Sequence, residues 1–420
     1  MPHLSMKWAP LQPLLQKLFL GLLVLGLAAC ATGPRKAPSA PAAPAPTADR
    51  DRPPPPPPQN KVALLVPTTG SNAAVGQSIA NATSLALLDL GNQKIKLTVY
   101  NTATGATEAA RRALADGNRL FLGPLLAPDV RAVQPLAQRA QVPLLTFSND
   151  ASLAGGGTYV LGFQPDQSMN RIVAFARERG VERFAALVPS GVYGERVSAA
   201  FLKAVRDNGG RVNAVEIFTR DRAKLTTSAR RITDYEARVA RASQGGVLRA
   251  DGTIAPVQER IAPVNFQALL IADTAAIASA FTPALQQYGA KGVRLLGPEL
   301  WASEPGIARV PALHGAWFAS VPDNRFEQMA DRYAAKFGGR PSRLASLGYD
   351  AVLLINSLAD RWTIGEPFPR AALANPDGFA GVDGIFRFAS NGVAERGLEV
   401  QQVGPEGFST VSPAPRRFGE

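Results

Sequence analysis

The stretch "KVALLVPTTGSNAAVGQSIANATSLALLDL", residues 61–90, joins a strand pattern to a helix pattern. Val62 to Val66 form a continuous apolar run, which is typical of a buried parallel strand, and Pro67 to Gly70 supply turn residues that end it. The apolar residues after the turn recur at spacings of three and four, which predicts one buried face of a helix. These residues are Val75, Ile79, Ala82, Ala86 and Leu90.

Strand and helix patterns continue to alternate along the chain. Short apolar runs predict further strands at 95–99, 120–122, 144–146, 184–188, 212–217, 268–271 and 293–296. Helical spacing lies between several of them, at 130–140 and 197–205. This alternation predicts an α/β fold of parallel sheets with right-handed crossovers, in which ligands bind beyond the carboxyl ends of the strands. The second series of strands indicates a second lobe.

Longer stretches resemble a known family. "KVALLVPTTG", "LFLGPLLAPDVRAVQPLAQRAQVPLLTFS" and "YVLGFQPDQSMNRIVAFARERGVERFAALVPSGVYGERVSAAFLKAVRDNGGRV" are similar to type I periplasmic binding proteins of the leucine/isoleucine/valine class, and the match runs from about residue 61 to 405. Within that class, "VRLLGPELW", "LHGAWFAS", "RLASLGYDAVLL" and "GFAGVDGIFRF" most resemble lipoproteins that activate penicillin-binding proteins. The best-studied of these carry a helical-repeat domain before the shared fold, where this chain has a Pro-rich segment.

The resemblance implies a two-lobed type I fold, each lobe a parallel sheet flanked by helices, with three crossings between the lobes. We expect the crossings near Phe163, at 321–324 and at 372–380. Lobe 1 then comprises 61–163 and 324–372, lobe 2 comprises 164–321 and 380–405, and 406–420 form a tail. Asn391-Gly392, between 385–388 and 398–400, predicts a hairpin turn that closes lobe 2.

The beginning of the chain has the pattern of an export signal. Lys7 and Lys17 flank an apolar core at 18–27 that is too short to span a bilayer, and Ala28-Ala29 precede Cys30, the single cysteine. "LAAC" resembles the lipobox of bacterial lipoproteins, which implies a signal peptide at 1–29 and acyl chains that anchor Cys30 in a membrane. The alternative is an ordinary cleaved signal with a chance cysteine. Ala31 after the cysteine favours the outer membrane over the inner membrane by the family's sorting rule, and hence a periplasmic location.

Residues 30–59 are predicted to be a tether. The run "APSAPAAPAPTADRDRPPPPPPQN" has too few apolar residues for a core and too many prolines for a helix. In polyproline II conformation it rises about 3.1 Å per residue and reaches on the order of 80 Å. We therefore interpret it as a spacer between membrane and folded domain; the alternative is that Pro53 to Pro58 bind a groove in a partner.

The composition argues against an enzyme. His314 is the only histidine after residue 3, which excludes sites built from several histidines and favours a structural or surface role for this one. No phosphate-binding loop, dinucleotide fingerprint or serine-hydrolase motif occurs. We therefore expect no catalytic residues, no metal and no cofactor, and a function in binding.

The predicted ligand residues follow the strand ends. In amino-acid-binding relatives, hydroxyls and backbone amides hold the ligand carboxylate and an acidic side chain pairs with the ammonium group. The matching positions are Thr68, Thr69, Ser148, Asn149 and Tyr193, with Asp273 or Glu299 facing the ammonium group. Each has a structural alternative: the threonines cap the following helix, Ser148-Asn149 form a turn, Tyr193 packs on a loop and Glu299 is solvated. The loop 124–127, "PLLA", lacks the hydroxyls usual in the family.

A basic insertion lies at 219–265. Leu225, Ile232, Tyr235 and Val239 form a thin apolar stripe on a helix that is rich in arginine. The usual interpretation is a solvated face, and the alternative is a docking surface for a protein or an anionic polymer. The formal net charge of +12 suits an anionic cell envelope. We do not expect nucleic-acid binding, because export removes the chain from nucleic acid.

Two functions remain. The first is a regulator of a peptidoglycan synthase, with a penicillin-binding protein as partner. The second is a substrate-binding lipoprotein of an ABC transporter, whose lobes close on an amino-acid-like ligand. The outer-membrane signal, the spacer and the loop at 124–127 favour the regulator.

Overall fold

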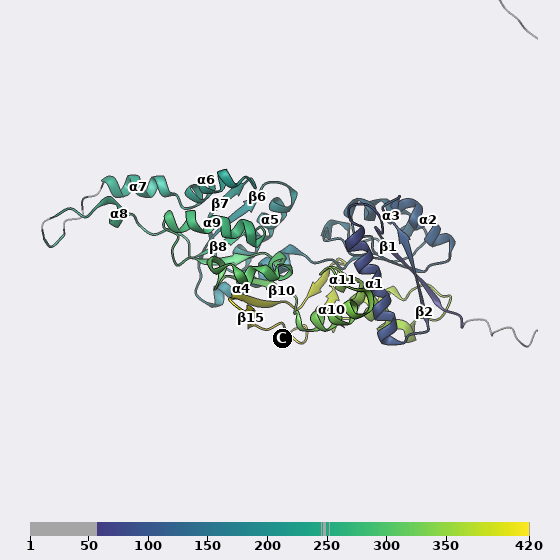
Figure 1. Cartoon of the computed structure of the whole chain (residues 1–420). Coiled ribbons are helices and arrows are strands. Elements are labelled where there is room, and N and C mark those ends of the chain that lie inside the picture. The colour runs from purple at the N-terminus through teal and green to yellow at the C-terminus, as the bar shows by residue number, and fades with distance from the viewer. Residues whose placement is uncertain (1–56, 245, 247–248, 252, 420) are drawn as a thin grey trace, which may run out of the picture. The chain divides into compact units, whose positions relative to one another are not determined.

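The computed structural model describes residues 57–419, apart from residues 245, 247, 248 and 252 (Figure 1). The predicted signal peptide, Cys30 and the tether up to residue 56 lie outside the described residues and stay predictions. Within the described part, no helix combines the length and the apolar character needed to cross a membrane.

Lobe 1 contains a parallel sheet with the strand order β2-β1-β3-β4-β5. Its strands are β1 (Asn60–Val66), β2 (Ile95–Asn101), β3 (Leu120–Leu122), β4 (Leu144–Thr146) and β5 (Thr158–Val160). Its helices are α1 (Ala73–Leu90), α2 (Ala106–Ala115), α3 (Ala127–Arg139), α10 (Asn324–Phe337) and α11 (Ala345–Leu358), with short 3-10 helices at Ala151–Leu153, Ala359–Arg361 and Arg370–Ala374. The strands predicted from apolar runs are therefore present.

The apolar run of β1 is buried on both faces of this sheet. Val62 and Leu64 belong to one core cluster with residues of α1 and α11, whereas Ala63 and Leu65 pack with residues of α2 and α3. Because successive side chains of a strand point to opposite faces, a strand covered by helices on both sides must be apolar throughout. This explains why no polar residue interrupts 62–66.

Lobe 2 contains a mixed sheet with the order β15-β14-β10-β9-β8-β6-β7. Its strands are β6 (Arg183–Pro189), β7 (Arg211–Phe218), β8 (Ala268–Ile271), β9 (Arg294–Gly297), β10 (Trp317–Ser320), β14 (Glu399–Gly404) and β15 (Gly407–Ser412). Its helices are α4 (Pro165–Glu178), α5 (Val192–Asp207), α6 (Arg222–Ile232), α7 (Tyr235–Gln244), α8 (Val257–Arg260) and α9 (Ala275–Gln287), with 3-10 helices at Glu299–Ser303, Pro305–Arg309 and Pro311–Leu313. Helices α4 and α5 share one core cluster with the sheet, and α6 and α9 share another.

In each lobe, the backbone of the helix that follows the first strand passes very close to the end of that strand. A Cβ atom on Gly76 would lie 1.9 Å from the carbonyl oxygen of Pro67, and one on Gly194 would lie 1.6 Å from that of Pro189. Only glycine allows the helix backbone to come this close to the end of the strand. The two lobes therefore bring their first strand–helix turn to the same position at the carboxyl edge of the sheet.

The tail predicted at 406–420 is wrong in its first half. Residues Gly407–Ser412 form β15, which pairs antiparallel with β14. The ring of Phe408 packs edge-on against Phe318 with 4.9 Å between ring centroids. This apolar contact explains why the chain turns back after β14 and extends the sheet.

The third crossing also differs from the prediction of 372–380. Strands β11 (Phe379–Gly381), β12 (Gly384–Phe388) and β13 (Ala394–Arg396) form a small antiparallel sheet, and Phe386 lies in the same buried cluster as Val62 of lobe 1. Residues 380–396 therefore pack with lobe 1, and the chain passes to lobe 2 between Arg396 and Glu399. Asn391-Gly392 does lie in a hairpin, but the hairpin joins β12 to β13, and the amide of Val160 donates to the carbonyl of Gly392.

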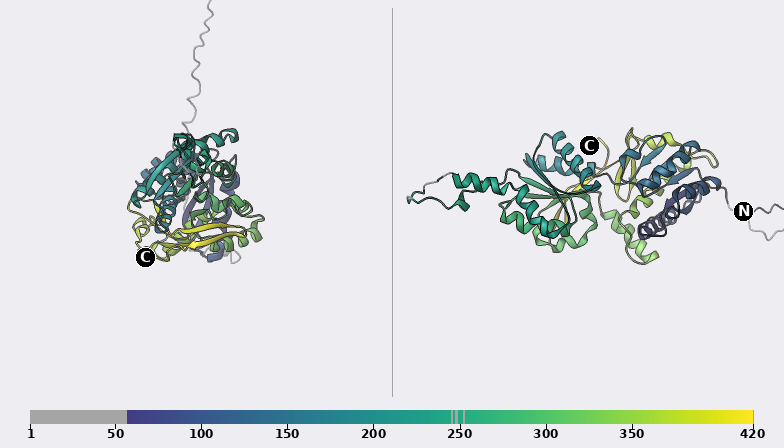
Figure 2. Two further views of the ribbon diagram at one scale, coloured as in Figure 1. Left: turned by 90° about the vertical axis from the view of Figure 1, so that its left-hand side faces the viewer. Right: turned by 90° about the horizontal axis from the view of Figure 1, so that it is seen from above.

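The stretch of the basic insertion that was expected to be one helix forms two, α6 and α7, and the short helix α8 follows them. The helix ends at Ile232, Asp234 adopts a left-handed conformation (φ 49°), and α7 begins at Tyr235. Leu225 and Ile232 are buried against lobe 2, whereas α7 and α8 extend away from the sheet (Figures 1 and 2). Arg238 of α7 holds this helix against its neighbouring segments, because its guanidinium group donates to the carbonyls of Thr233, Ala262 and Tyr288.

Candidate ligand-binding cavity

A cavity of about 540 Å³ lies where the carboxyl edges of the two sheets meet the segments that connect the lobes. Its lining comes from both lobes and from each crossing. The lining residues are Asn72, Val75, Leu125, Leu126, Phe147, Asn149, Phe163, Gln164, Gln167, Ser168, Glu299, Leu300, Ala302, Ser303, Ala319, Ser320, Val321, Ser342, Arg343, Leu344, Arg396 and Leu398. This volume suits a small molecule.

The lobe 1 wall of the cavity is mainly apolar. Leu125 and Leu126 come from the loop between β3 and α3, Phe147 follows β4, and Val75 lies in the first turn of α1. The polar exceptions on this wall are Asn72, Asn149, Ser342 and Arg343. The strand ends thus bring the predicted loop "PLLA" to the cavity, and it contributes carbon rather than hydroxyl groups.

The lobe 2 wall carries a carboxyl group. Glu299 follows β9 and lines the cavity beside Ser168 of α4, whose hydroxyl donates to Glu299 Oε2 over 3.0 Å. Burial raises the pKa of Glu299 above its ordinary value. A carboxylate in this position is stabilised by any hydrogen-bond donor or cation that enters the cavity.

Tyr193 and Asp273 lie near Glu299 but do not line the cavity. Among the described residues, nothing accepts from or donates to the buried hydroxyl of Tyr193. Burial, followed by the negative charges of Glu299 and Asp273, raises the pKa of Tyr193. Asp273 is 1% exposed and pairs with Arg220, 2.7 Å away. Asp273 is thus satisfied within lobe 2, whereas the Tyr193 hydroxyl is not.

Thr68 and Thr69 form hydrogen bonds to the end of the neighbouring strand β2. The amide of Thr68 donates to Asn101 Oδ1 over 2.9 Å, and Asn101 Nδ2 donates to Thr69 Oγ1 over 2.8 Å. Neither threonine lines the cavity, and neither caps α1, whose N-cap residue is Asn72. The threonines therefore fix the end of β1 to the end of β2.

Ser148 adopts the structural alternative, a turn. Its hydroxyl accepts from the amide of Asp150 over 3.2 Å, and the side chain is buried. Asp150 in turn pairs with Arg131 of lobe 1 at 2.7 Å and with Arg196 of lobe 2 at 3.2 Å. The predicted ligand residues thus separate: Asn149 and Glu299 line the cavity, whereas Thr68, Thr69, Ser148, Tyr193 and Asp273 do not.

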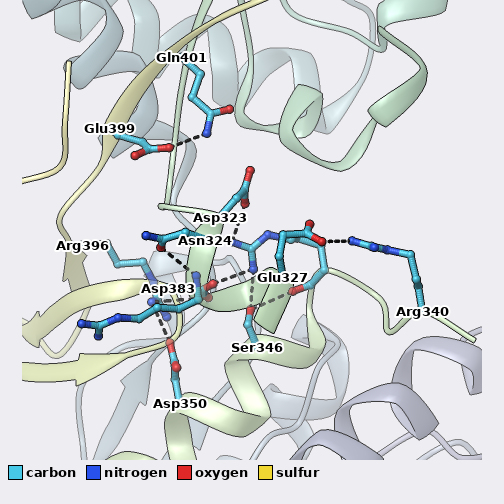
Figure 3. Close-up of polar contacts among 12 residues, drawn as sticks. Asp323, Asn324, Glu327, Arg340, Ser346, Asp350, Asp383, Arg396, Glu399 and Gln401 are labelled. Carbon is cyan, nitrogen blue, oxygen red and sulfur yellow. Dashed lines mark hydrogen bonds and ion pairs between the residues drawn. The ribbon is translucent and has the colours of Figure 1, made fainter. Parts of the chain in front are cut away.

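A set of charged residues beneath the cavity was missed from the sequence. We call Asp323, Arg343, Asp350, Asp383 and Arg396 the charged cluster (Figure 3). Arg343 and Arg396 line the cavity, and their side chains are 12% and 2% exposed. The cluster therefore borders both the cavity and the crossings between the lobes.

Ion pairs hold the charged cluster together. Arg343 lies 2.7 Å from Asp383 and 3.4 Å from Asp323, which follows β10 at the second crossing. Arg396 lies 3.6 Å from Asp350 and 3.9 Å from Asp383. Figure 3 draws these three residues side by side, with dashed lines for the contacts among them.

Arg396 also reaches the first crossing. Its Nη2 donates to the carbonyl of Leu161 over 3.0 Å, and its guanidinium carbon lies 5.0 Å from the ring centroid of Phe163. Since Arg396 itself precedes the third crossing, one network touches all three crossings that the described residues form.

Asp350 is fully buried, as is Asp383. The amide of Val382 donates to Asp350 Oδ1 over 2.6 Å, and a Cβ atom on Gly381 would lie 2.4 Å from its carboxyl carbon. Burial, followed by the charge of Asp383, raises the pKa of Asp350 to about 7. The sequence held a signal for this cluster, because "RLASLGYD" and "GVDG" place charged residues inside apolar runs.

The sequence of this chain matches one known protein family. A family described as periplasmic binding protein matches residues 59–407. Among curated proteins, an uncharacterized protein of Rickettsia prowazekii (strain Madrid E) is 22% identical over 176 residues. The match covers 41% of this chain and 47% of that protein, so the chain spans about half the length of this relative.

Solved structures of similar fold include ligand-binding proteins and a regulator. A putative branched-chain amino acid ABC transporter protein from Rhodospirillum rubrum is 20% identical and covers 84% of this chain and 100% of its own, with a TM-score of 0.68. A leucine-binding protein from Thermotoga maritima is 20% identical, with 84% and 98% covered and a TM-score of 0.54.

The regulator is the C-domain of LpoA from Haemophilus influenzae, described as a regulator of PBP1A. It is 19% identical, with 84% of this chain and 100% of its own covered and a TM-score of 0.61. At these identities the likeness shows the fold, the two-lobed α/β arrangement of periplasmic binding proteins.

Proposed function

Because the chain belongs to the periplasmic binding protein family, we propose that it is a non-enzymatic, lipid-anchored envelope protein that activates a peptidoglycan synthase. Its partner is then a penicillin-binding protein, and Cys30 holds it at the outer membrane. One observation carries the choice of a regulator over an amino-acid receptor. The hydroxyls of Thr69 and Ser148, two of those predicted to hold a ligand carboxylate, are bonded within the protein away from the cavity, and Leu125 and Leu126 line it.

The argument rests on what a buried carboxylate requires. A carboxylate that leaves water needs charged or hydrogen-bonding partners. Thr69 accepts from Asn101 and Ser148 accepts from Asp150, and neither residue lines the cavity, so neither can donate its hydroxyl hydrogen to a ligand there. Leu125 and Leu126 line the cavity and offer a carboxylate no side-chain donor, and the two arginines that line it, Arg343 and Arg396, are already paired with aspartates. This arrangement disfavours tight binding of an α-amino acid.

Two further observations support a regulator. The match covers the whole of the LpoA C-domain, which is described as a regulator of PBP1A, and 84% of this chain. The predicted Pro-rich tether would carry the folded part away from the membrane towards the cell wall. A transport receptor delivers its ligand to a permease in the inner membrane and gains little from an anchor in the outer one.

The alternative is a substrate-binding lipoprotein of an ABC transporter for amino acids or related small molecules. The cavity itself favours it, because Glu299 is a buried acid with Ser168 as its side-chain donor. The ligand that fits this wall carries an amine that pairs with Glu299 and an apolar body that packs on Leu125, Leu126 and Phe147. Solved structures of similar fold include proteins of amino acid transport.

The proposal is tested with the full-length protein and a purified bifunctional penicillin-binding protein from the same cell. We expect the rate of glycan polymerisation or cross-linking to rise when the protein is added, and chemical cross-linking to join the two chains. A matched control is the variant Arg396→Ala, which we expect to disturb the crossings between the lobes. An unchanged rate together with no cross-link would contradict a regulator.

A thermal shift panel separates the alternative from the proposal. Leucine, other amino acids, amines and muropeptides are added at millimolar concentration, because a ligand that binds the folded state raises the melting temperature by mass action. Stabilisation by an amino acid that is lost in Glu299→Gln and kept in Glu304→Gln would support the transport receptor. Glu304 suits the control because it is a glutamate of lobe 2 outside the cavity lining.

A further inference from the structure

The C-terminal segment of the chain contacts both lobes. Strand β15 ends at Ser412 in the sheet of lobe 2, and the ring of Phe418 lies 4.4 Å from the guanidinium carbon of Arg387 on the small sheet of lobe 1. Phe418 is half-buried there. A Cβ atom on Gly378 would lie only 2.8 Å from Phe418 Cε2, so the glycine leaves room for the ring.

Lobe 2 holds the start of this segment through Arg171. Arg171 of α4 donates through Nε to the carbonyl of Leu398 over 3.1 Å and through Nη2 to Ser412 Oγ over 2.5 Å. Leu398 belongs to the third crossing between the lobes. One half-buried guanidinium group therefore fixes both the crossing and the point where the C-terminal segment leaves the sheet.

The middle of the segment passes over the third crossing. A Cβ atom on Gly397 would lie 3.3 Å from the carbonyl oxygen of Pro415. Between the segment and α4 lies a cavity of about 810 Å³, with Arg171, Pro413 and Phe418 in its lining. The segment therefore touches the body of the protein at its two ends and at the crossing, and it leaves space elsewhere.

We infer that residues Pro413 to Phe418 form a strap that limits how far the two lobes separate. Six Cα–Cα steps lie between Ser412 and Phe418, so the strap reaches at most about 20 Å when fully extended. A wider opening requires Phe418 to leave its place beside Gly378. Pro413 and Pro415 restrict the backbone of the strap. They therefore limit the conformational entropy that the strap gains when it is not extended.

The strap acts at the same place as the charged cluster and from the other side of the crossing. Arg396 pairs with Asp350 and Asp383 on the lobe 1 side of Gly397, and Pro415 covers Gly397 itself. The charged cluster holds the crossing in its position, whereas the strap sets the range of movement. This inference does not depend on whether the cavity takes a ligand or the protein activates a synthase.

Hydrogen exchange of the full-length protein, read by mass spectrometry, tests the strap. The variants are Phe418→Ala and a chain that ends at Ser412, and the matched control is Arg417→Ala at the exposed neighbouring position. We expect exchange at the crossings, 161–164, 321–323 and 397–398, to rise about fivefold in both variants, which corresponds to about 1 kcal/mol. Exchange in β1 and β6 should stay at the level of the parent.

Two outcomes would overturn the inference. Unchanged exchange at the crossings in both variants would show that the segment does not limit the lobes. A rise of equal size in β1 and β6 would show that the segment stabilises the whole fold. If the shortened chain fails to fold, Phe418→Leu keeps the test open, because it retains apolar contact with Gly378 and loses the ring over Arg387.

Discussion

The two walls of the cavity use their polar groups in opposite ways. On lobe 1 the hydroxyls of Thr69 and Ser148 already accept hydrogen bonds from the protein, and leucines face the cavity. On lobe 2 Glu299 lines the cavity, and the buried hydroxyl of Tyr193 has no partner in the described part of the chain. A buried polar group without a partner costs about 1–3 kcal/mol. Lobe 2 therefore offers the polar groups that are free to recognise a ligand, whereas lobe 1 offers leucines and two arginines, Arg343 and Arg396, that are already paired with aspartates.

The largest expected effect lies in the charged cluster, which is bonded within the protein and borders both walls. Arg396→Ala leaves Asp350 buried without its paired cation, although Asp383 keeps Arg343, and breaking a buried pair costs about 3–5 kcal/mol. Arg340→Ala removes the exposed pair with Glu327 and should cost at most about 1 kcal/mol. Urea denaturation of the variants measures both. Equal losses would contradict the structural role that we give to the cluster.

The second prediction concerns pH. Burial raises the pKa of Asp350 to about 7. Between its unfolded value and its folded value the folded state holds the extra proton, so the contribution of Asp350 to stability is present at low pH and is lost as pH rises from about 4 to about 7. The free energy of unfolding, measured by denaturant titration, should therefore decline over this range.

Asp350→Asn is the matched variant for this measurement. Its side-chain oxygen still accepts from the amide of Val382, and it does not titrate. The decline between about pH 4 and about pH 7 should become smaller in this variant. A decline of the same size in parent and variant would assign the pH dependence to other groups.

A smaller effect is expected on the lobe 2 wall. Burial raises the pKa of Glu299, so its ionised form destabilises the fold at neutral pH, and Glu299→Gln should raise the free energy of unfolding. Glu327→Gln, on an exposed glutamate, should leave it nearly unchanged or lower it slightly. Thermal and urea unfolding at neutral pH provide the measurement. Lower stability of Glu299→Gln would mean that the hydrogen bond from Ser168 stabilises the carboxylate by more than burial destabilises it.

The smallest effect is expected at Tyr193. Tyr193→Phe removes a buried hydroxyl without a partner in the described residues, so stability should rise by up to about 1 kcal/mol. Ser148→Ala should instead lower it by about 1 kcal/mol, because its hydroxyl accepts from the amide of Asp150. Stability changes of opposite sign in the two variants would support the contrast between the walls, and changes of the same sign would contradict it. Denaturant titration of both variants decides.

The fold could be predicted where local pattern determines it. The apolar run of β1 and the helical spacing of α1 mark buried elements on their own, and so do β6 and α5. The third crossing could not be predicted, because β11–β13 are short strands that either lobe could accept. Their place follows from Phe386, which enters the cluster around Val62 more than 300 residues earlier. Only the folded chain brings these residues together.

The residues of the candidate site also divide into those that local sequence pattern predicts and those whose position depends on the folded chain. Asn149 and Glu299 follow strand ends and were predicted from that position. The threonines were misassigned because their partner, Asn101, lies at the end of β2, and the register that pairs Val66 with Asn101 is not visible in the sequence. The charged cluster was missed for a related reason. Arg343 and Asp350 are close in sequence, but their charges are balanced by Asp383, in the turn between β11 and β12, and by Arg396 of β13.

The central claim is that the lobe 1 wall does not hold an amino acid's carboxylate. Calorimetric titration of the full-length protein with leucine, isoleucine and valine tests it most directly. We predict no saturable heat at millimolar concentrations of any of the three. Stoichiometric binding of one of them with micromolar affinity would contradict the claim and would identify the chain as a transport receptor.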